Sequence, residues 1–410
     1  MEMVLKTDAI YSTKIKIVGV GGAGVNAVNS MIKSDIQSVE FVVANCDVKD
    51  LSKSLASKRI YLGSKLTKGD GAGGIPEIGR RAAEESLEDI EEMLMDTSML
   101  FIAAGMGGGT GTGAAPVIAR KAKEMKILTL GIVSLPFDFE GKNRRENACK
   151  GIQEIQDVVD TLIVIPNNKM AKIYGKLPFM EAFKRTDDII TNAAHSISDI
   201  VNRAGYINID FADIKSVMSD AGYALMGIGM AEGDDRAMKA SKEAIENPLL
   251  QDIDLTGCKG LLINVSAGND FMMDEFDQIS EVITSETGKN GNIFIGFTPD
   301  DSLEGKVKVT IIATGLSPSE AVKSLQLENI NLGFDKKPPM TIEMPPQPPK
   351  PPIDDEWKVI RERIKNANNP SEPEPKSPEP APSINNSGKM FNSIDFKQSD
   401  PPAFLKKYFQ

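Results

Sequence analysis

The chain has 410 residues, of which 41% are hydrophobic, which is enough for two domains with buried cores. Its formal net charge is −11, which argues against a nucleic-acid partner and against direct binding to anionic lipid. Three widely separated cysteines and a single histidine, His195, exclude a disulfide framework, a cysteine zinc site and a multi-histidine metal centre. We therefore predict no metal site built from protein ligands alone.

The N-terminal segment carries no sign of a secretory signal. It has no basic stretch followed by an apolar run and a small-residue cleavage site. No apolar run in the chain approaches the roughly 18–20 residues that a helix needs to span a bilayer. We therefore expect a soluble, cytoplasmic protein without direct membrane insertion.

Apolar strands alternate with helical segments in the first part of the chain. The predicted strands are Lys14–Val20, Glu40–Ala44, Met99–Ala104, Ile127–Leu135 and Thr161–Ile165, and the helices include Asn26–Lys33, Ile75–Met95 and Ala114–Met125. This alternation predicts a parallel sheet with helices on both faces. A long apolar-faced segment, Phe179–Arg203, then predicts a largely buried helix.

A second α/β region and a tail follow. The region holds predicted helices Lys215–Met226, Arg236–Glu246 and Asp274–Ser285, and predicted strands Gly260–Ser266, Ile293–Phe297 and Lys306–Ala313. Sixteen of the 24 prolines lie between Pro338 and Pro402, so we expect a disordered linker there. Two islands within it, Asp355–Ile364 and the terminal DPPAFLKKYFQ, are typical of partner-binding peptides.

A first glycine-rich loop, Gly19–Asn26, lies directly between a predicted strand and a helix. Glycines let the backbone approach phosphate oxygens, and the amides at a helix N-terminus attract negative charge. The same residues match the dinucleotide pattern GxGxxG, and Asp47 ends the next strand where that pattern places a ribose-binding acid. At this point an NAD-dependent dehydrogenase is a serious alternative.

A second loop, Gly105–Gly113, follows the strand Met99–Ala104. Gly107–Gly113 holds five glycines and two threonines, which offer backbone amides and hydroxyls to successive phosphates. A dinucleotide fold leaves this second loop unexplained, and the Walker pattern GxxxxGK[ST] is absent. The second phosphate loop therefore argues against the NAD-dependent dehydrogenase.

The segment GGGTGTGAAP at Gly107–Pro116 resembles the phosphate-loop signature of the tubulin/FtsZ family. Further segments resemble FtsZ in order and spacing: Asn45–Asp47, Gly71–Gly73, Pro136–Glu140 with Arg144, and Asn208–Asp213. The resemblance spans residues 12–316, and Pro402–Lys407 is similar to the family's C-terminal peptide. Cys46, where the family usually has Thr, and Ile75, where it often has Asn, depart from the pattern.

The resemblance implies a tubulin-like fold: a parallel-sheet GTP-binding domain joined by a long central helix to a smaller α/β domain, then a disordered tail. The implied boundaries are 1–178 for the GTP-binding domain, 179–204 for the central helix, 205–316 for the assembly domain, 317–397 for the linker and 398–410 for the partner-binding peptide. GTP/GDP is the implied nucleotide, with a magnesium ion.

The resemblance also implies which residues bind and act. The nucleotide-binding residues would be Gly21, Gly22, Ala23, Gly24, Val25, Asn26, Asp47, Ala72, Gly73, Gly105, Gly107, Gly108, Gly109, Thr110, Gly111, Thr112, Gly113, Glu140 and Arg144, with Phe183 and Asp188 at guanine. The adjacent Asp187 leaves the guanine assignment open. Asn208, Asp210 and Asp213 would be catalytic. They follow a helix of about 37 Å, and we therefore expect them to act on the GTP of the next subunit.

The function that follows from the resemblance is an assembly-activated GTPase. It would form the division ring at mid-cell as a head-to-tail homopolymer. Its C-terminal peptide would recruit cell-division adaptors and membrane-tether proteins. The alternatives are a tubulin-like filament for plasmid or organelle positioning and the dehydrogenase already considered.

Overall fold

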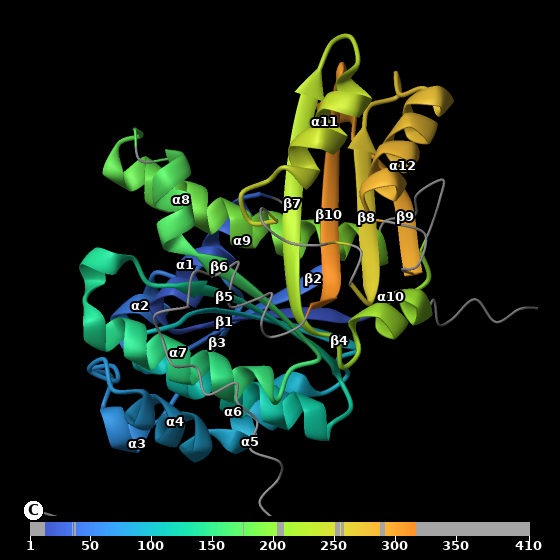
Figure 1. Ribbon diagram of the computed structural model, residues 1–410. Coiled ribbons are helices and arrows are strands. Elements are labelled where there is room, and N and C mark those ends of the chain that lie inside the picture. The colour runs from blue at the N-terminus through green and yellow to red at the C-terminus, as the bar shows by residue number, and fades with distance from the viewer. Residues whose placement is uncertain are drawn as a thin grey trace, which may run out of the picture. The chain divides into compact units, whose positions relative to one another are not determined.

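A ten-stranded sheet with the strand order β3-β2-β1-β4-β5-β6-β7-β10-β8-β9 organises the protein (Figure 1). The computed structural model describes residues 13–34, 36, 38–174, 176–202, 209–250, 255, 258–287 and 292–316. The strands are β1 (Ile15–Val20), β2 (Val39–Asn45), β3 (Lys58–Tyr61), β4 (Met99–Gly105), β5 (Leu128–Leu135), β6 (Thr161–Pro166), β7 (Gly222–Glu232), β8 (Gly260–Ala267), β9 (Asn292–Pro299) and β10 (Lys306–Leu316).

Helices occur on both faces of the sheet (Figure 1). They are α1 (Gly21–Lys33), α2 (Val48–Ser52), α3 (Ser64–Thr67), α4 (Pro76–Glu85), α5 (Leu87–Leu94), α6 (Thr110–Glu124), α7 (Lys142–Gln156), α8 (Asn167–Tyr174), α9 (Phe179–Asn202), α10 (Phe211–Met218), α11 (Arg236–Ile245) and α12 (Met273–Thr287). Two short 3-10 turns, η1 (Asp138–Glu140) and η3 (Asp301–Leu303), complete the described elements.

The six strands from β3 to β6 in the sheet order are parallel, and β1, β4, β5 and β6 among them are buried on both faces. Alternate residues of β1 enter different cores: Ile17 packs in the cluster that contains α1 and α9, and Val18 in the one that contains α4 to α7. A strand whose every residue is buried reads as a continuous apolar run, which is typical of parallel sheets. The predicted parallel sheet with helices on both faces is confirmed.

The second α/β region continues the same sheet. β7 pairs in parallel with β6 over Thr161–Ile163 and Gly222–Ala224. β10 then lies between β7 and β8 and runs antiparallel to both, so the sheet is mixed at this end. Seen from the sequence, these strands suggested a separate region because no periodicity reports the β6–β7 pairing.

Two predicted helices differ from the structure. The predicted helix Lys215–Met226 is wrong in its second half, because α10 ends at Met218 and β7 begins at Gly222, whose φ of +71° is incompatible with a continuing helix. The glycines of β7 allow α11 to pack closely, since a Cβ at Gly229 would lie 2.0 Å from the Ala240 carbonyl oxygen. The predicted helix Ile75–Met95 is interrupted at Ser86, which ends α4 and precedes α5.

The central helix α9 has 24 residues and is therefore about 36 Å long. The predicted Arg203 end, Asn208, the linker, the Asp355–Ile364 island and the terminal peptide lie outside the described residues. Among the helices of the described ranges, none combines the length and apolar character that a membrane crossing requires.

Candidate nucleotide site

A pocket of about 510 Å³ lies at the carboxyl ends of the parallel strands. Residues at the ends of five of them line it: Val20 of β1, Asn45 of β2, Gly105 of β4, Ser134 of β5 and Asn167 after β6. In open α/β sheets, ligands bind outside the carboxyl ends of the strands. The volume suits a ligand of nucleotide size.

The first glycine loop turns β1 directly into α1. Gly21 has a φ of +72°, and a Cβ there would lie 2.9 Å from the Gly111 amide nitrogen. Among the described residues, no side chain caps α1 and no acid lies in its first turn, so the amides of Gly22 and Ala23 stay available at the pocket. Free amides at a helix N-terminus form an anion site.

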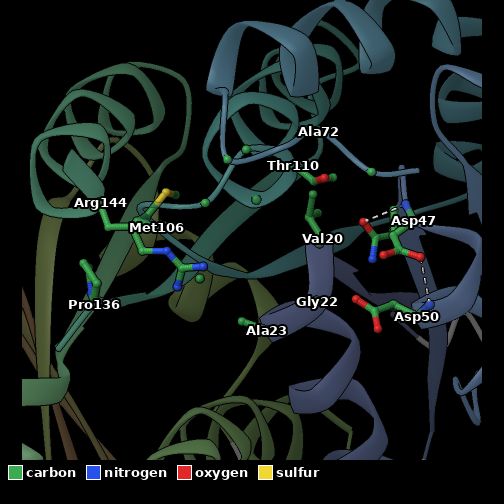
Figure 2. A pocket seen from close by; sticks show the side chains of 18 of the residues that line it. Val20, Gly22, Ala23, Asp47, Asp50, Ala72, Met106, Thr110, Pro136 and Arg144 are labelled. Atoms are coloured by element: carbon green, nitrogen blue, oxygen red, sulfur yellow. Dashed lines mark hydrogen bonds between the residues drawn. The ribbon is translucent and has the colours of Figure 1, made fainter. Parts of the chain in front are cut away.

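The second loop leads from β4 into α6. Gly107 has a φ of +104°, and its amide donates a 2.8 Å hydrogen bond to Oγ1 of the buried Thr112. This bond holds the loop from beneath, while Gly108 and Gly109 line the pocket. Figure 2 shows Thr110 at the start of α6, above Val20 and Gly22. The two helix N-termini therefore meet at one pocket.

Some of the predicted glycines face protein rather than the pocket. A Cβ at Gly24 would lie 2.5 Å from the Ala103 carbonyl oxygen, and one at Gly113 would lie 1.9 Å from the Pro76 carbonyl oxygen. These positions allow α1 to approach β4 and α6 to approach α4. Gly24 and Gly113 therefore allow close helix packing and do not contact the pocket.

The structure brings most of the predicted nucleotide-binding residues together. Those that line the pocket are Gly21, Gly22, Ala23, Asn26, Asp47, Ala72, Gly73, Gly105, Gly108, Gly109, Thr110, Gly111, Glu140 and Arg144. Those outside the lining are Gly24, Val25, Gly107, Thr112, Gly113 and Asp188. Phe183 lies within α9, and its side chain is outside the described part of the chain.

Two asparagines that were not among the predicted nucleotide-binding residues also line the pocket. Within the described residues, Nδ2 of Asn45 and Oδ1 of Asn167 are buried without a hydrogen-bond partner. Buried polar groups are nearly always paired, so these two atoms fit a polar ligand. A polar residue at the carboxyl end of an apolar strand is the sequence signal that identifies both.

An ion pair stands on one side of the pocket. Arg144 donates through Nη1 to Oε2 of Glu140, and Oε1 of Glu140 accepts a 2.9 Å bond from the Phe137 amide. Glu140 is thus fixed to its own turn, whereas the Arg144 side chain is 55% exposed. Figure 2 shows Arg144 across the pocket from Asp47 and Asp50. The guanidinium is suited to a phosphate.

The acidic side of the pocket is partly structural. Oδ1 of Asp47 caps α2, accepting from the Lys49 amide at 2.8 Å and the Asp50 amide at 3.4 Å. In the part of the chain that is described, no group of three or more His, Cys, Asp or Glu side chains is placed to hold a metal. A magnesium ion would fit here chiefly through the phosphates, since it keeps waters and needs few protein carboxylates.

The first half of α9 contributes a carboxylate. Asp187 lines the pocket, and its neighbour Asp188 does not. Burial, and secondarily the charge of Asp188, raise the pKa of Asp187 to about 6. A carboxyl with a pKa this high in a pocket is a candidate ligand-binding group.

The predicted catalytic acids lie elsewhere. Asp210 precedes α10 and is exposed, and Asp213 is half-buried in its first turn. Asn208 lies outside the described residues. The carbonyl oxygen of Met218, at the end of α10, accepts a 2.6 Å bond from Oγ1 of Thr161. Thr161 begins β6, so α10 packs at the amino end of the strand whose carboxyl end adjoins the pocket.

The two uncapped helix N-termini and the unpaired polar atoms define an α/β protein with a phosphate-binding nucleotide pocket. The model of the Tubulin/FtsZ family, GTPase domain, matches residues 14–175, and that of the FtsZ family, C-terminal domain, matches residues 222–317. The chain belongs to the tubulin/FtsZ family. The resemblance stated from the motifs is confirmed, and GTP/GDP is the nucleotide of this family.

Individual relatives agree. The chain is 49% identical over 329 residues to Cell division protein FtsZ of Wolbachia sp, covering 77% of this chain and 83% of that protein. It is 45% identical over 310 residues to Cell division protein FtsZ of Buchnera aphidicola, covering 75% and 80%. The FtsZ dimer of M. jannaschii superposes with a TM-score of 0.71 at 40% identity, covering 74% and 88%. The predicted tubulin-like fold is confirmed.

Proposed function

We propose that the protein is a GTPase that assembles head to tail and completes hydrolysis at the junction between subunits. The observation that carries this proposal is the separation of Asp210 and Asp213 from the pocket. α10 packs at the amino end of β6, and the pocket adjoins its carboxyl end, about 17–20 Å away along six residues of strand. Acids placed there serve a second copy stacked against the pocket, where they orient the attacking water.

The roles within the pocket follow from its geometry. The amides at the starts of α1 and α6, together with Arg144, bind the phosphates, and a magnesium ion held chiefly by those phosphates would neutralise part of their charge. The carboxylate in the first half of α9 accepts from the two N–H donors of guanine, which selects GTP over ATP. Asp188 was the predicted acceptor, and the lining favours its neighbour Asp187.

A base-swap experiment identifies the acceptor. Replacing a guanine-binding carboxylate with an amide turns an acceptor into a donor, which suits xanthine, whose 2-position carries a carbonyl. We expect Asp187→Asn to lose GTP affinity and gain affinity for XTP, and the matched Asp188→Asn to keep GTP preference. Equal hydrolysis of ATP and GTP by the wild type would contradict the proposed specificity.

A mixing experiment tests the shared site. Asp213→Asn should bind GTP and hydrolyse little, whereas Gly108→Asp should bind GTP poorly and keep its own acids. A Cβ at Gly108 would meet open space, so the carboxylate of the introduced aspartate should repel phosphate without disturbing the fold. The mixture should regain part of the GTPase activity, because each chain supplies what the other lacks. Co-assembly without recovered turnover, verified by sedimentation, would exclude the shared site.

The proposed cellular role is cytokinesis. The relatives named above are cell division proteins, and the terminal segment Pro402–Lys407 resembles the family's partner-binding peptide. The filament would form the division ring at mid-cell, tethered by adaptors that bind residues 398–410. A chain lacking 398–410 should assemble with GTP as the full chain does, yet fail to locate to the division site. Normal localisation of this truncated chain would contradict the role of the peptide.

A further inference from the structure

Three exposed apolar side chains belong to the segments that line the nucleotide pocket. Val48 is 45% exposed, Ile75 50% and Phe139 67%, and each is next in sequence to a residue that lines the pocket. They come from three segments far apart in the chain: the start of α2, the residue before α4 and the turn η1. We call these three residues the apolar rim.

Ile75 occupies a position where its side chain does not stabilise the isolated chain. It is the N-cap residue of α4, with a φ of −105°, and it makes no side-chain capping bond among the described residues. Isoleucine is among the weakest N-caps, whereas asparagine, aspartate and serine are the best, because their side chains accept from free helix amides. The position thus leaves α4 uncapped and exposes an apolar group to water.

We propose that Ile75 is a contact residue on which a second copy of this chain docks, with Val48 and Phe139 completing the apolar rim around the covered pocket. This inference rests on the proposed head-to-tail function. Asp210 and Asp213 lie at the opposite end of β6 from the pocket, so another copy must cover the pocket mouth to bring its acids there. The rim is continuous with that contact, and a related chain forms a dimer.

The apolar rim also has a physical role in the reaction. Apolar contacts around a polar centre exclude water from an interface and strengthen the interactions inside it. A rim that closes over the bound nucleotide makes assembly and the enclosure of the phosphates one event. Ile75 therefore stabilises the assembled state at the expense of the isolated chain.

The test replaces Ile75 with the residue that its backbone position favours. Ile75→Asn should raise the melting temperature of the unassembled chain by about 2–4 °C, because it supplies the missing cap. The critical concentration for GTP-dependent light scattering should rise about three- to tenfold, because half of an isoleucine side chain is no longer buried. GTP affinity, measured below the critical concentration, should not change.

Two further variants separate the rim from general surface effects. Ile75→Leu keeps the apolar group and should assemble as the wild type does. Met95→Asn removes another exposed apolar side chain of the same sheet half, 58% exposed and away from the pocket lining, and should leave the critical concentration unchanged. A wild type that does not assemble with GTP would refute the proposed function itself. If the wild type assembles, two results would overturn this inference alone. One is an Ile75→Asn critical concentration equal to that of the wild type, and the other is an equal rise in the critical concentrations of Ile75→Asn and Met95→Asn.

Discussion

The two strand-to-helix junctions of the nucleotide site solve the same problem with different amounts of chain. At the first, Gly21 alone makes the turn and α1 begins at once. At the second, four residues separate β4 from α6, and Thr112 supports the loop from below. In both, glycines that face the pocket are followed by one that faces protein, Gly24 or Gly113. Glycine in such a loop therefore has two separate uses, and substitutions can distinguish them.

The largest effect is expected at the glycine that faces protein in the second junction. Gly113→Ala would place a methyl group 1.9 Å from the Pro76 carbonyl oxygen and 2.6 Å from the Arg80 amide nitrogen. Because both are backbone atoms, α4 and α6 must separate, and we expect unfolding free energy to fall by about 3 kcal/mol. Urea denaturation measures it. A variant as stable as the wild type would remove the distinction between the two uses of glycine.

The support beneath the second junction comes next. Thr112→Val keeps the shape of the side chain and leaves the Gly107 amide without its acceptor, which should cost about 1–3 kcal/mol of unfolding free energy. Thr112→Ser keeps the hydroxyl and should retain most of the stability. A loss of stability in Thr112→Ser with none in Thr112→Val would assign the role to the methyl group of Thr112, which faces Gly151, instead of the hydroxyl.

The glycine that faces the pocket should behave in the opposite way. A Cβ at Gly108 meets nothing within 4 Å, so Gly108→Ala should change stability by less than about 0.5 kcal/mol. It should nevertheless weaken GTP binding about tenfold, because the methyl group occupies space that the phosphate needs. Titration with a fluorescent GTP analogue measures the affinity. Full affinity would show that Gly108 does not approach the phosphates.

The smallest effect concerns the base end of the pocket, which neither junction forms. Burial raises the pKa of Asp187 to about 6, and guanine binding favours the ionised carboxylate. Affinity should therefore be nearly constant above pH 7 and fall about fourfold between pH 7 and pH 5.5, where about three-quarters of the carboxyl is protonated. The ligand is GDP. Asp187→Asn is the control, because its pH dependence reports only the titration of the GDP phosphates. A pH profile of this variant identical to that of the wild type would contradict the assignment.

The motifs predicted the strands at this site closely because a buried parallel strand is a continuous apolar run. β1, β4 and β5 each lie within one residue of the predicted bounds. The error at Lys215–Met226 arose because Tyr223–Met226 continues the apolar pattern of α10, and only pairing with β6 and β10 makes it a strand. Likewise, the packing of Gly24 against β4 and the unpaired amide of Asn45 depend on neighbours that are distant in sequence.

The sequence by itself determined the two phosphate loops, the family and the acid-rich segment after the central helix, because each depends on residues adjacent in the chain. Only the tertiary structure decided that β7 joins the sheet of β6, that Asp187 rather than Asp188 lines the pocket, and that α10 packs at the opposite end of β6. These outcomes depend on strand pairing and on the rotation of α9 against the sheet. Both are set by packing between segments far apart in the chain, which no local pattern encodes.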